Sequence, residues 1–100
     1  AAHEEMFGPV ASLWKVSSLS QAIERANDSP FGLGSSICTA AKAEIEMAIR
    51  DLNAGSTFVN SKVASDPRLP FGGVKASGYG RELAADGIKA FINRKTVSIA

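Results

Sequence analysis

The stretch LGSSICTAAKAEIEMAIRDLNAGSTFVN, residues 33–60, decides the fold. It begins and ends with short segments typical of buried strands, residues 33–39 and 56–60. Between them, apolar residues recur at the i, i+3, i+4 and i+7 spacing of one helix face: Ile45, Ala48, Ile49 and Leu52. This order predicts two parallel strands joined by a right-handed crossover through a helix.

Two residues mark the ends of that helix. Thr39 is of the type that caps a helix N-terminus. Gly55 lies just past the last apolar position, where a left-handed residue closes a helix at little cost.

The same alternation precedes this stretch. Residues 10–16, VASLWKV, follow Pro9 and predict another buried strand. Ser18 and Gln21 then have the spacing of a capping box. A helical stripe follows at Leu19, Ala22, Ile23 and Ala26. The fold class is therefore α/β, with a parallel βαβαβ sheet.

The periodic pattern ends at residue 61. Residues 61–80 form a long segment that holds four glycines but also packable apolar residues, which favours an ordered, functional loop. Residues 81–92 predict a third helix, weakened by Gly87, and residues 96–100, TVSIA, predict a tail strand.

The glycine-containing motif PFGGVKASGYGRE, residues 70–82, is not a phosphate cradle. A dinucleotide fingerprint needs a third glycine where Leu83 stands. A P-loop needs Lys-Ser or Lys-Thr after its last glycine, whereas Gly78 is followed by Tyr79. We interpret the motif as an ordered turn that the aromatic side chains of Phe71 and Tyr79 anchor.

The net charge of +1 indicates neither nucleic acid nor an anionic membrane as a partner. No apolar run approaches the roughly 18 residues that a membrane span needs. Positive charge gathers in residues 61–81, on Lys62, Arg68, Lys75 and Arg81. This segment is either a solvated basic loop or a surface that meets an anionic ligand.

The single cysteine, Cys38, excludes an internal disulfide and fits a reducing, cytoplasmic compartment. A catalytic cysteine needs an activating base, and the only histidine is His3 near the N-terminus. We interpret Cys38 as a buried structural residue. The glutamates offer no spacing typical of a metal site, so no metal is predicted.

The segment EEMFGPV, residues 4–10, places two carboxylates and an aromatic ring directly before a predicted strand. Ligand-binding groups gather near strand ends in α/β sheets. A carboxylate there can accept both hydroxyl groups of a ribose, and an aromatic ring can pack a planar ring. The residues alone leave open a surface acidic pair and a core Phe7.

Five segments together resemble the carboxyl-terminal part of the NAD(P)-dependent aldehyde dehydrogenases: EEMFGPV, AIERANDSPFGLGSSICT, GSTFVNS, PFGGVKASGYGRE and KTVSI. VASDPRLPFGG is most similar to the succinate-semialdehyde branch. The resemblance implies that residues 1–94 belong to the catalytic domain and residues 95–100 to the oligomerisation sheet. Members are several times longer, so we expect a fragment; a stand-alone, non-catalytic α/β binding or interaction module is the alternative.

The resemblance also assigns roles to four residues. Glu5 matches the glutamate that binds the hydroxyls of the nicotinamide ribose, and Phe7 the aromatic beside the nicotinamide. Phe71 matches a wall of the aldehyde pocket. Ser65 matches a serine that contacts the far carboxylate of succinate semialdehyde, although a turn with the following Asp-Pro is the simpler interpretation.

The chemistry that the resemblance implies is oxidation of an aldehyde to the acid, through a cysteine thioester, with NAD or NADP as cofactor. The nucleophilic cysteine and the general base are expected upstream, so no catalytic residue is predicted in this chain, and alone it should be inactive. The implied partners are the aldehyde and further copies of the chain, in a dimer or tetramer formed through residues 96–99.

Overall fold

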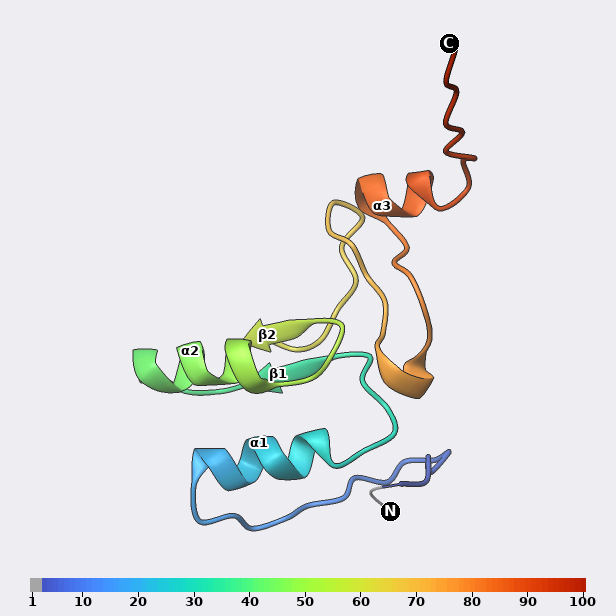
Figure 1. Ribbon diagram of the computed structural model, residues 1–100. Coiled ribbons are helices and arrows are strands. Elements are labelled where there is room, and N and C mark those ends of the chain that lie inside the picture. The colour runs from blue at the N-terminus through green and yellow to red at the C-terminus, as the bar shows by residue number, and fades with distance from the viewer. Residues whose placement is uncertain (1–2) are drawn as a thin grey trace.

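A computed structural model describes residues 3–100 (Figure 1). The elements in chain order are α1 (Leu19–Asn27), β1 (Ser35–Ile37), α2 (Lys42–Asp51), β2 (Thr57–Val59), the 3₁₀ turn η1 (Lys75–Ser77) and α3 (Ala84–Lys89). Strands β1 and β2 pair in parallel, with Ser35 opposite Thr57 and Ile37 opposite Val59. The predicted α/β class and the parallel strand–helix–strand unit are therefore confirmed.

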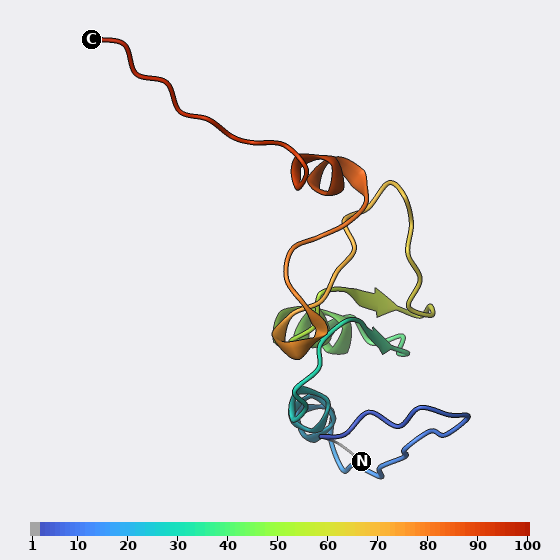
Figure 2. The same ribbon diagram turned by 90° about the vertical axis from the view of Figure 1, so that its right-hand side faces the viewer.

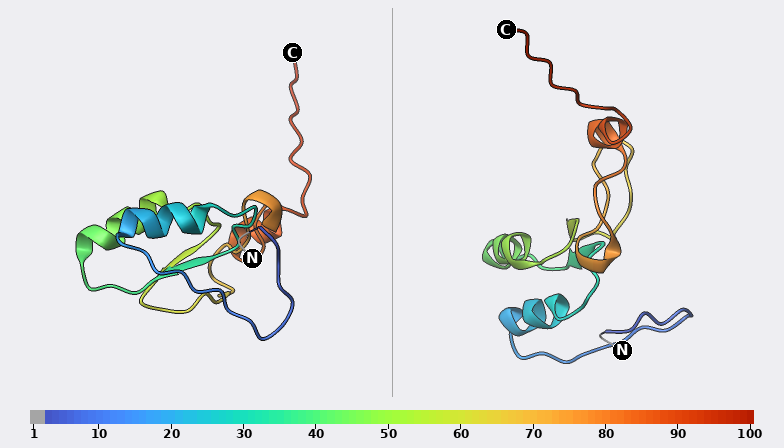
Figure 3. Two further views of the ribbon diagram at one scale, coloured as in Figure 1. Left: turned by 90° about the horizontal axis from the view of Figure 1, so that it is seen from below. Right: turned by 45° about the vertical axis from the view of Figure 1, so that its right-hand side comes forward.

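The two long helices lie together. Figures 2 and 3 show α1 and α2 side by side, both on the same side of the two strands. Their buried apolar residues, Ile23 of α1 and Ala48 of α2, belong to the helical stripes that the sequence predicted. The stripes therefore predicted correctly which helix faces are covered.

The predicted cap of α1 forms, with one change of partner. The Ser18 hydroxyl accepts the backbone N–H of Gln21 at 3.2 Å, as a capping serine does. The Gln21 side chain reaches back to the N–H of Ser17 at 2.7 Å rather than to that of Ser18. The Ser18 bond satisfies a backbone N–H that the first helical turn leaves without a partner, and the Gln21 bond ties the residue before the N-cap to the helix.

The prediction for Thr39 needs a smaller correction. The N-cap of α2 is Ala41, which makes no side-chain cap of its own. The Thr39 hydroxyl accepts the N–H of Ala41 at 3.1 Å, so it supports the start of α2 from two residues upstream.

The prediction that Gly55 closes α2 in a left-handed conformation is wrong. The helix ends at Asp51, and its C-cap Leu52 is extended, at φ −73° and ψ 121°. Gly55 is not among the residues with positive φ. A Cβ at Gly55 would lie 1.7 Å from the carbonyl oxygen of Gly72, so glycine is needed here because two backbone segments touch.

Residues 10–16 form no strand, contrary to prediction. They run as an exposed segment, in which Leu13 is 92% exposed, and pair with no other strand among residues 3–100. A strand exists only where a neighbour receives its backbone hydrogen bonds, and apolar composition alone does not supply one. The sheet therefore has two strands instead of three.

The third helix is shorter than predicted, because the backbone before it is left-handed. Leu83 and Ala84 have φ values of 64° and 49°. Glu82 is held instead in an antiparallel bridge to Phe71. The helix that follows, α3, needs Gly87 for packing, since a Cβ there would lie 3.0 Å from the carbonyl carbon of Glu82. Residues 93–100 extend away from the rest without forming a strand in this chain (Figure 1).

The chain exposes far more surface than a compact domain of its size. Its radius of gyration is 17.1 Å, whereas about 13 Å is usual for 100 residues. Its accessible surface is 7825 Å², against roughly 5,400 Å² for a compact monomer of this mass. Phe7, Leu13, Tyr79, Phe91 and Ile99 are each at least 90% exposed. Within residues 3–100, no helix has the length and apolar character to cross a bilayer.

We predict that Gly55→Ala destabilises the full-length protein that carries this chain. The new Cβ cannot fit beside Gly72 without a backbone shift, and we expect a loss of about 3 kcal/mol of unfolding free energy. Thermal unfolding measures the loss. Asn53→Ala, on the exposed surface of the same connection, is the control and should cost less than about 0.5 kcal/mol. Equal melting temperatures for the two variants would contradict the prediction.

Candidate functional site

The glycine motif folds as an ordered turn that binds the connection between α1 and β1. Val74 donates its backbone N–H to the carbonyl of Gly32 at 2.9 Å, and Ala76 donates to that of Pro30 at 2.9 Å. The N–H of Gly32 in turn donates to the hydroxyl of Ser77 at 2.9 Å. These bonds attach η1 to residues 30–32 at several points.

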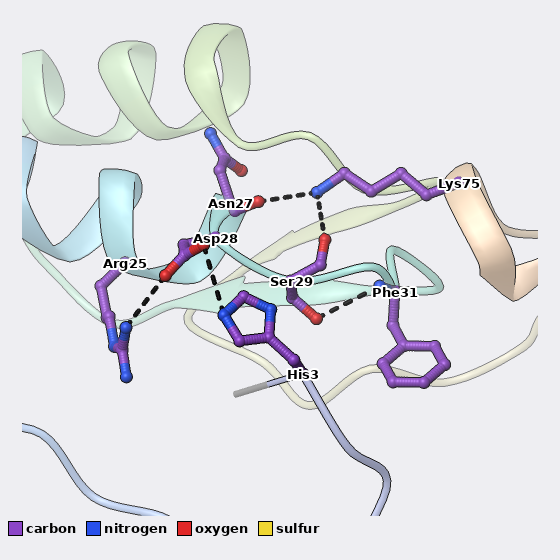
Figure 4. A network of polar contacts seen from close by, with 7 residues as sticks. All are labelled: His3, Arg25, Asn27, Asp28, Ser29, Phe31 and Lys75. Atoms are coloured by element: carbon purple, nitrogen blue, oxygen red, sulfur yellow. Dashed lines mark hydrogen bonds and ion pairs between the residues drawn. The ribbon is translucent and has the colours of Figure 1, made fainter. Parts of the chain in front are cut away.

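Lys75 adds a charged contact to this attachment. Its ammonium donates to the carbonyl oxygens of Asn27 and Ser29, at 2.9 and 3.0 Å (Figure 4). These carbonyls lie at the C-terminal end of α1, where the helix dipole favours a positive charge. Lys75 is half-buried and holds a left-handed backbone, with φ 55°. Such a conformation is unfavourable for an L-residue and persists where its surroundings fix it.

Two further cations of residues 61–81 also have partners within the chain. Arg81 donates to the carbonyls of Gly73 and Gly80, at 2.8 and 2.6 Å. Arg68 pairs with the carboxylate of Asp66 at 2.6 Å. The side-chain hydrogen bond from Arg68 lowers the pKa of Asp66 below its ordinary value. Three of the four cations, Arg68, Lys75 and Arg81, are thus bound by groups of the chain itself, whereas the exposed Lys62 makes no hydrogen bond or ion pair within residues 3–100.

The turn after Ser65 is formed by Asp66. The carbonyl of Asp66 accepts the N–H of Leu69 at 2.9 Å, and its carboxylate accepts that of Arg68 at 2.9 Å. Within residues 3–100, the Ser65 hydroxyl makes no hydrogen bond, and the residue is exposed. The turn that the sequence predicted after Ser65 therefore exists. Asp66 forms it, and the Ser65 side chain does not take part.

Phe71 is fixed more firmly. It exchanges two backbone hydrogen bonds with Glu82, of 2.9 and 2.7 Å, and is half-buried. This bridge closes residues 71–82 into a loop, which we call the bracing loop. The loop contains η1 and is tied internally by Arg81.

Glu5 and Phe7 lie on the segment before α1, residues 3–16, which we call the N-terminal stretch. Both are exposed, and Phe7 is 94% exposed, so the core position left open for Phe7 is wrong. The stretch is held near the end of α1 by two contacts. The guanidinium of Arg25 lies 4.8 Å from the centre of the Trp14 ring, and His3 Nε2 lies 3.7 Å from Asp28 Oδ1.

The structure does not bring all four predicted site residues together. Figures 1 and 3 show the N-terminal stretch on the far side of α1, whereas residues 61–70 lie beyond the strands. The predicted cofactor residues Glu5 and Phe7 and the predicted substrate residues Ser65 and Phe71 are therefore separate, and we call them the two predicted half-sites. The end of α1 contacts both the N-terminal stretch and the bracing loop, which begins at Phe71.

Cys38 is exposed, so the prediction of a buried cysteine is wrong. Cys38 lies one residue past β1, and the two-stranded sheet leaves it uncovered. Among residues 3–100, no group of His, Cys, Asp and Glu side chains is arranged to hold a metal ion.

Two asparagines have structural roles that the sequence analysis missed. The Asn27 amide donates to the carbonyl of Asp51 at 2.8 Å and accepts the N–H of Asn53 at 2.8 Å. The Asn60 amide accepts the N–H of Thr39 at 2.9 Å and donates to its carbonyl at 3.0 Å. Both side chains imitate backbone pairing. Asparagine following a predicted strand or helix was the available signal, since it tolerates such positions.

An open groove of about 700 Å³ runs along α3. It includes Glu82, the bridge partner of Phe71, and its walls are mainly apolar. Its lining includes Pro67, Tyr79, Leu83, Ile88 and Phe91. A smaller cavity of about 410 Å³ lies between the N-terminal stretch and the end of α1, and is lined by Glu4, Met6, Trp14, Arg25, Asp28 and Phe31, among others.

The architecture has close counterparts among known proteins. Residues 1–97 match the model of the aldehyde dehydrogenase family. The chain belongs to this family. It is 57% identical over 94 residues to an aldehyde dehydrogenase of Paenarthrobacter nicotinovorans, covering 94% of this chain and 20% of that protein.

Two other members are named for a specific substrate. The chain is 53% identical over 97 residues to succinate-semialdehyde dehydrogenase [NADP(+)] 1 of Mycobacterium tuberculosis, covering 97% of this chain and 21% of that protein. It superposes on the crystal structure of succinic semialdehyde dehydrogenase from Streptococcus pyogenes, in complex with NADP⁺, with a TM-score of 0.88 and 44% identity. That match covers 98% of this chain and 22% of the other. The chain thus spans about a fifth of the length of these relatives.

We predict that Asn27→Asp separates the ends of α1 and α2 in the full-length protein. Aspartate retains the acceptor for Asn53 but loses the donor to Asp51, and places a negative charge against that carbonyl. We expect a loss of about 1–3 kcal/mol of unfolding free energy. Chemical denaturation measures the loss, with the exposed Asn53→Asp as the control. A stability equal to wild type would show that the amide bridge contributes nothing.

Proposed function

We propose that this chain is the carboxyl-terminal part of an NAD(P)-dependent aldehyde dehydrogenase that oxidises succinate semialdehyde. The observation that carries the proposal is the match to the family over residues 1–97, together with the relatives named for that substrate. The engaged cations of the bracing loop support it too, because they make the glycine motif a brace instead of a phosphate site.

The N-terminal stretch offers groups that suit the nicotinamide end of the cofactor. Within residues 3–100, the Glu5 carboxylate makes no hydrogen bond, so its oxygens are available to the two hydroxyls of a ribose. The exposed Phe7 ring, two residues on, can lie against a planar ring. Bound NAD or NADP would supply the acceptor for the hydride that leaves the aldehyde carbon.

The other half-site offers groups that suit the substrate. Phe71, fixed by its bridge to Glu82, would form an apolar wall of the aldehyde pocket. The free hydroxyl of Ser65 would donate to the carboxylate at the far end of succinate semialdehyde. Arg68 adds little positive field there, since Asp66 offsets its charge, whereas the exposed Lys62, three residues before Ser65, would add to it.

The remaining parts of the reaction would come from outside these residues. We assign no catalytic residue to this chain: the nucleophilic cysteine that forms the thioester and the base that activates water would belong to the rest of the enzyme. The 100 residues alone would therefore not oxidise aldehydes. Residues 96–99, which extend free of the chain's own sheet, would pair with a second subunit in a dimer or tetramer.

We predict that Glu5→Gln in the full-length enzyme slows hydride transfer about tenfold or more. An amide accepts fewer hydrogen bonds from a diol than a carboxylate does, and poor orientation of the nicotinamide ring raises the barrier. Stopped-flow measurement of NADPH or NADH formation gives the rate. Glu4→Gln is the matched control and should leave it unchanged. Equal rates for both variants and wild type would remove Glu5 from the site.

We predict that Ser65→Ala reduces kcat/KM for succinate semialdehyde about ten- to a hundredfold. This is the effect of losing one hydrogen bond to a charged group, about 1.5–3 kcal/mol. An uncharged aldehyde of similar length should lose less than about threefold, because it has no carboxylate to bind. Steady-state kinetics on both substrates measure the difference. Equal losses would mean that Ser65 shapes the loop and does not contact the carboxylate.

A further inference from the structure

Residues 25–29, at the end of α1, contact both half-sites. On one side, Arg25 and Asp28 hold the N-terminal stretch. On the other, the carbonyls of Asn27 and Ser29 hold the bracing loop through Lys75 (Figure 4). The cofactor side and the substrate side of the proposed site are therefore joined through five consecutive residues.

The contact with the N-terminal stretch is made at two points that flank Glu5 and Phe7. His3 Nε2 lies 3.7 Å from Asp28, and the Trp14 ring lies under the guanidinium of Arg25 at 4.8 Å. Arg25 and Asp28 also bind each other at 3.0 Å. The position of α1's end thus determines where the stretch between these contacts lies.

One side chain of the bracing loop reaches the last residues of α1 itself. Lys75 is the point where the loop meets the helix end itself, whereas the backbone bonds of Val74 and Ala76 reach residues 30–32 farther along. The loop is closed at its base by the bridge from Phe71 to Glu82 and is tied internally by the bond from Arg81 to Gly73. We therefore expect a shift at Lys75 to reach Phe71.

We propose that Lys75 is a positioning residue for hydride transfer. Its ammonium, by binding the carbonyls of Asn27 and Ser29, sets the distance between Phe71 on the substrate side and Glu5 and Phe7 on the cofactor side. It touches neither substrate nor cofactor in this role. The inference rests on the proposed function, since it concerns the alignment of the aldehyde with the nicotinamide ring.

The test uses Lys75→Met in the full-length enzyme, which keeps the aliphatic stem and removes the donors. We expect kcat for succinate semialdehyde, expressed per cofactor site, to fall about ten- to a hundredfold, as misalignment on the order of 1 Å would cause. Fluorescence titration with NADPH or NADH counts the sites. The cofactor Kd should change less than about threefold, because Lys75 does not contact the cofactor.

An isotope effect separates positioning from simple destabilisation. With an aldehyde deuterated at the carbonyl carbon, the isotope effect on kcat should rise in Lys75→Met, since hydride transfer becomes the slow step. Loss of folded protein alone would lower the number of cofactor sites and leave kcat per site and the isotope effect unchanged. That result would overturn the proposal.

Two further variants complete the comparison. Lys75→Arg keeps a charged donor and should restore kcat to within about threefold of wild type. Lys42→Met removes a lysine that is 90% exposed and should match wild type in every measurement. If Lys75→Met does not fold, Lys75→Gln replaces it under the same criteria.

Failure of this proposal and failure of the proposed function give different results. A wild-type enzyme that oxidises no aldehyde with either cofactor would contradict the proposed function. Wild-type turnover, together with an unchanged kcat per site in the Lys75 variants, would overturn the positioning role alone.

Discussion

The carbonyl oxygen of Gly32 holds three segments of the chain together. It accepts the N–H of Gly55 at 3.0 Å and that of Val74 at 2.9 Å. The approach to β1, the connection from α2 to β2 and the bracing loop therefore meet at one atom. The meeting requires residues without Cβ atoms: at Gly32 a Cβ would lie 2.7 Å from a Val74 methyl group, and at Gly55 it would overlap Gly72.

This junction explains how a chain with so little core holds a defined arrangement. Ile23 and Ala48 are the buried apolar residues of the part that the structure describes, and burying them yields only a few kcal/mol. The segments are instead ordered by hydrogen bonds from the side chains of Lys75, Arg81 and Asn27 to backbone carbonyls. The surplus of roughly 2,400 Å² over a compact monomer is about three times the area that one partner buries in a standard interface. Such a surface suits a segment of a larger enzyme.

The sequence predicted what depends on nearby residues. The helical stripes and the Ser18 cap follow from patterns within about ten residues, the parallel pairing of the two strands follows from the strand–helix–strand order of residues 33–60, and all are confirmed. It failed where the outcome depends on distant segments. Residues 10–16 have the composition of a strand but have no partner strand among residues 3–100. Gly55 was expected to close a helix, whereas glycine is needed there because the backbone of the distant Gly72 lies against it. Exposure of Cys38 has the same origin, because it depends on which strands complete the sheet.

The candidate site was predictable only through the family resemblance. The sequence around Glu5 looks the same whether Glu5 binds a ligand or is an ordinary surface carboxylate. An exposed position fits both interpretations. The positive charges show most clearly what the sequence alone could not predict. Lys75 and Arg81 give the glycine motif the composition of an anion site, but their donors are used by carbonyls of the chain itself.

This use of the cations constrains how a carboxylate substrate could be bound. Arg68 is paired to Asp66, and the donors of Lys75 and Arg81 are used by backbone carbonyls, which leaves the exposed Lys62 as the cation of residues 61–81 that makes no such contact within residues 3–100. A neutral hydroxyl donates one hydrogen bond but does not offset a full negative charge. If Ser65 binds the substrate carboxylate, the compensating positive charge would have to come from Lys62 or from another part of the protein. Selectivity for a charged aldehyde would then depend on more than the Ser65 hydroxyl.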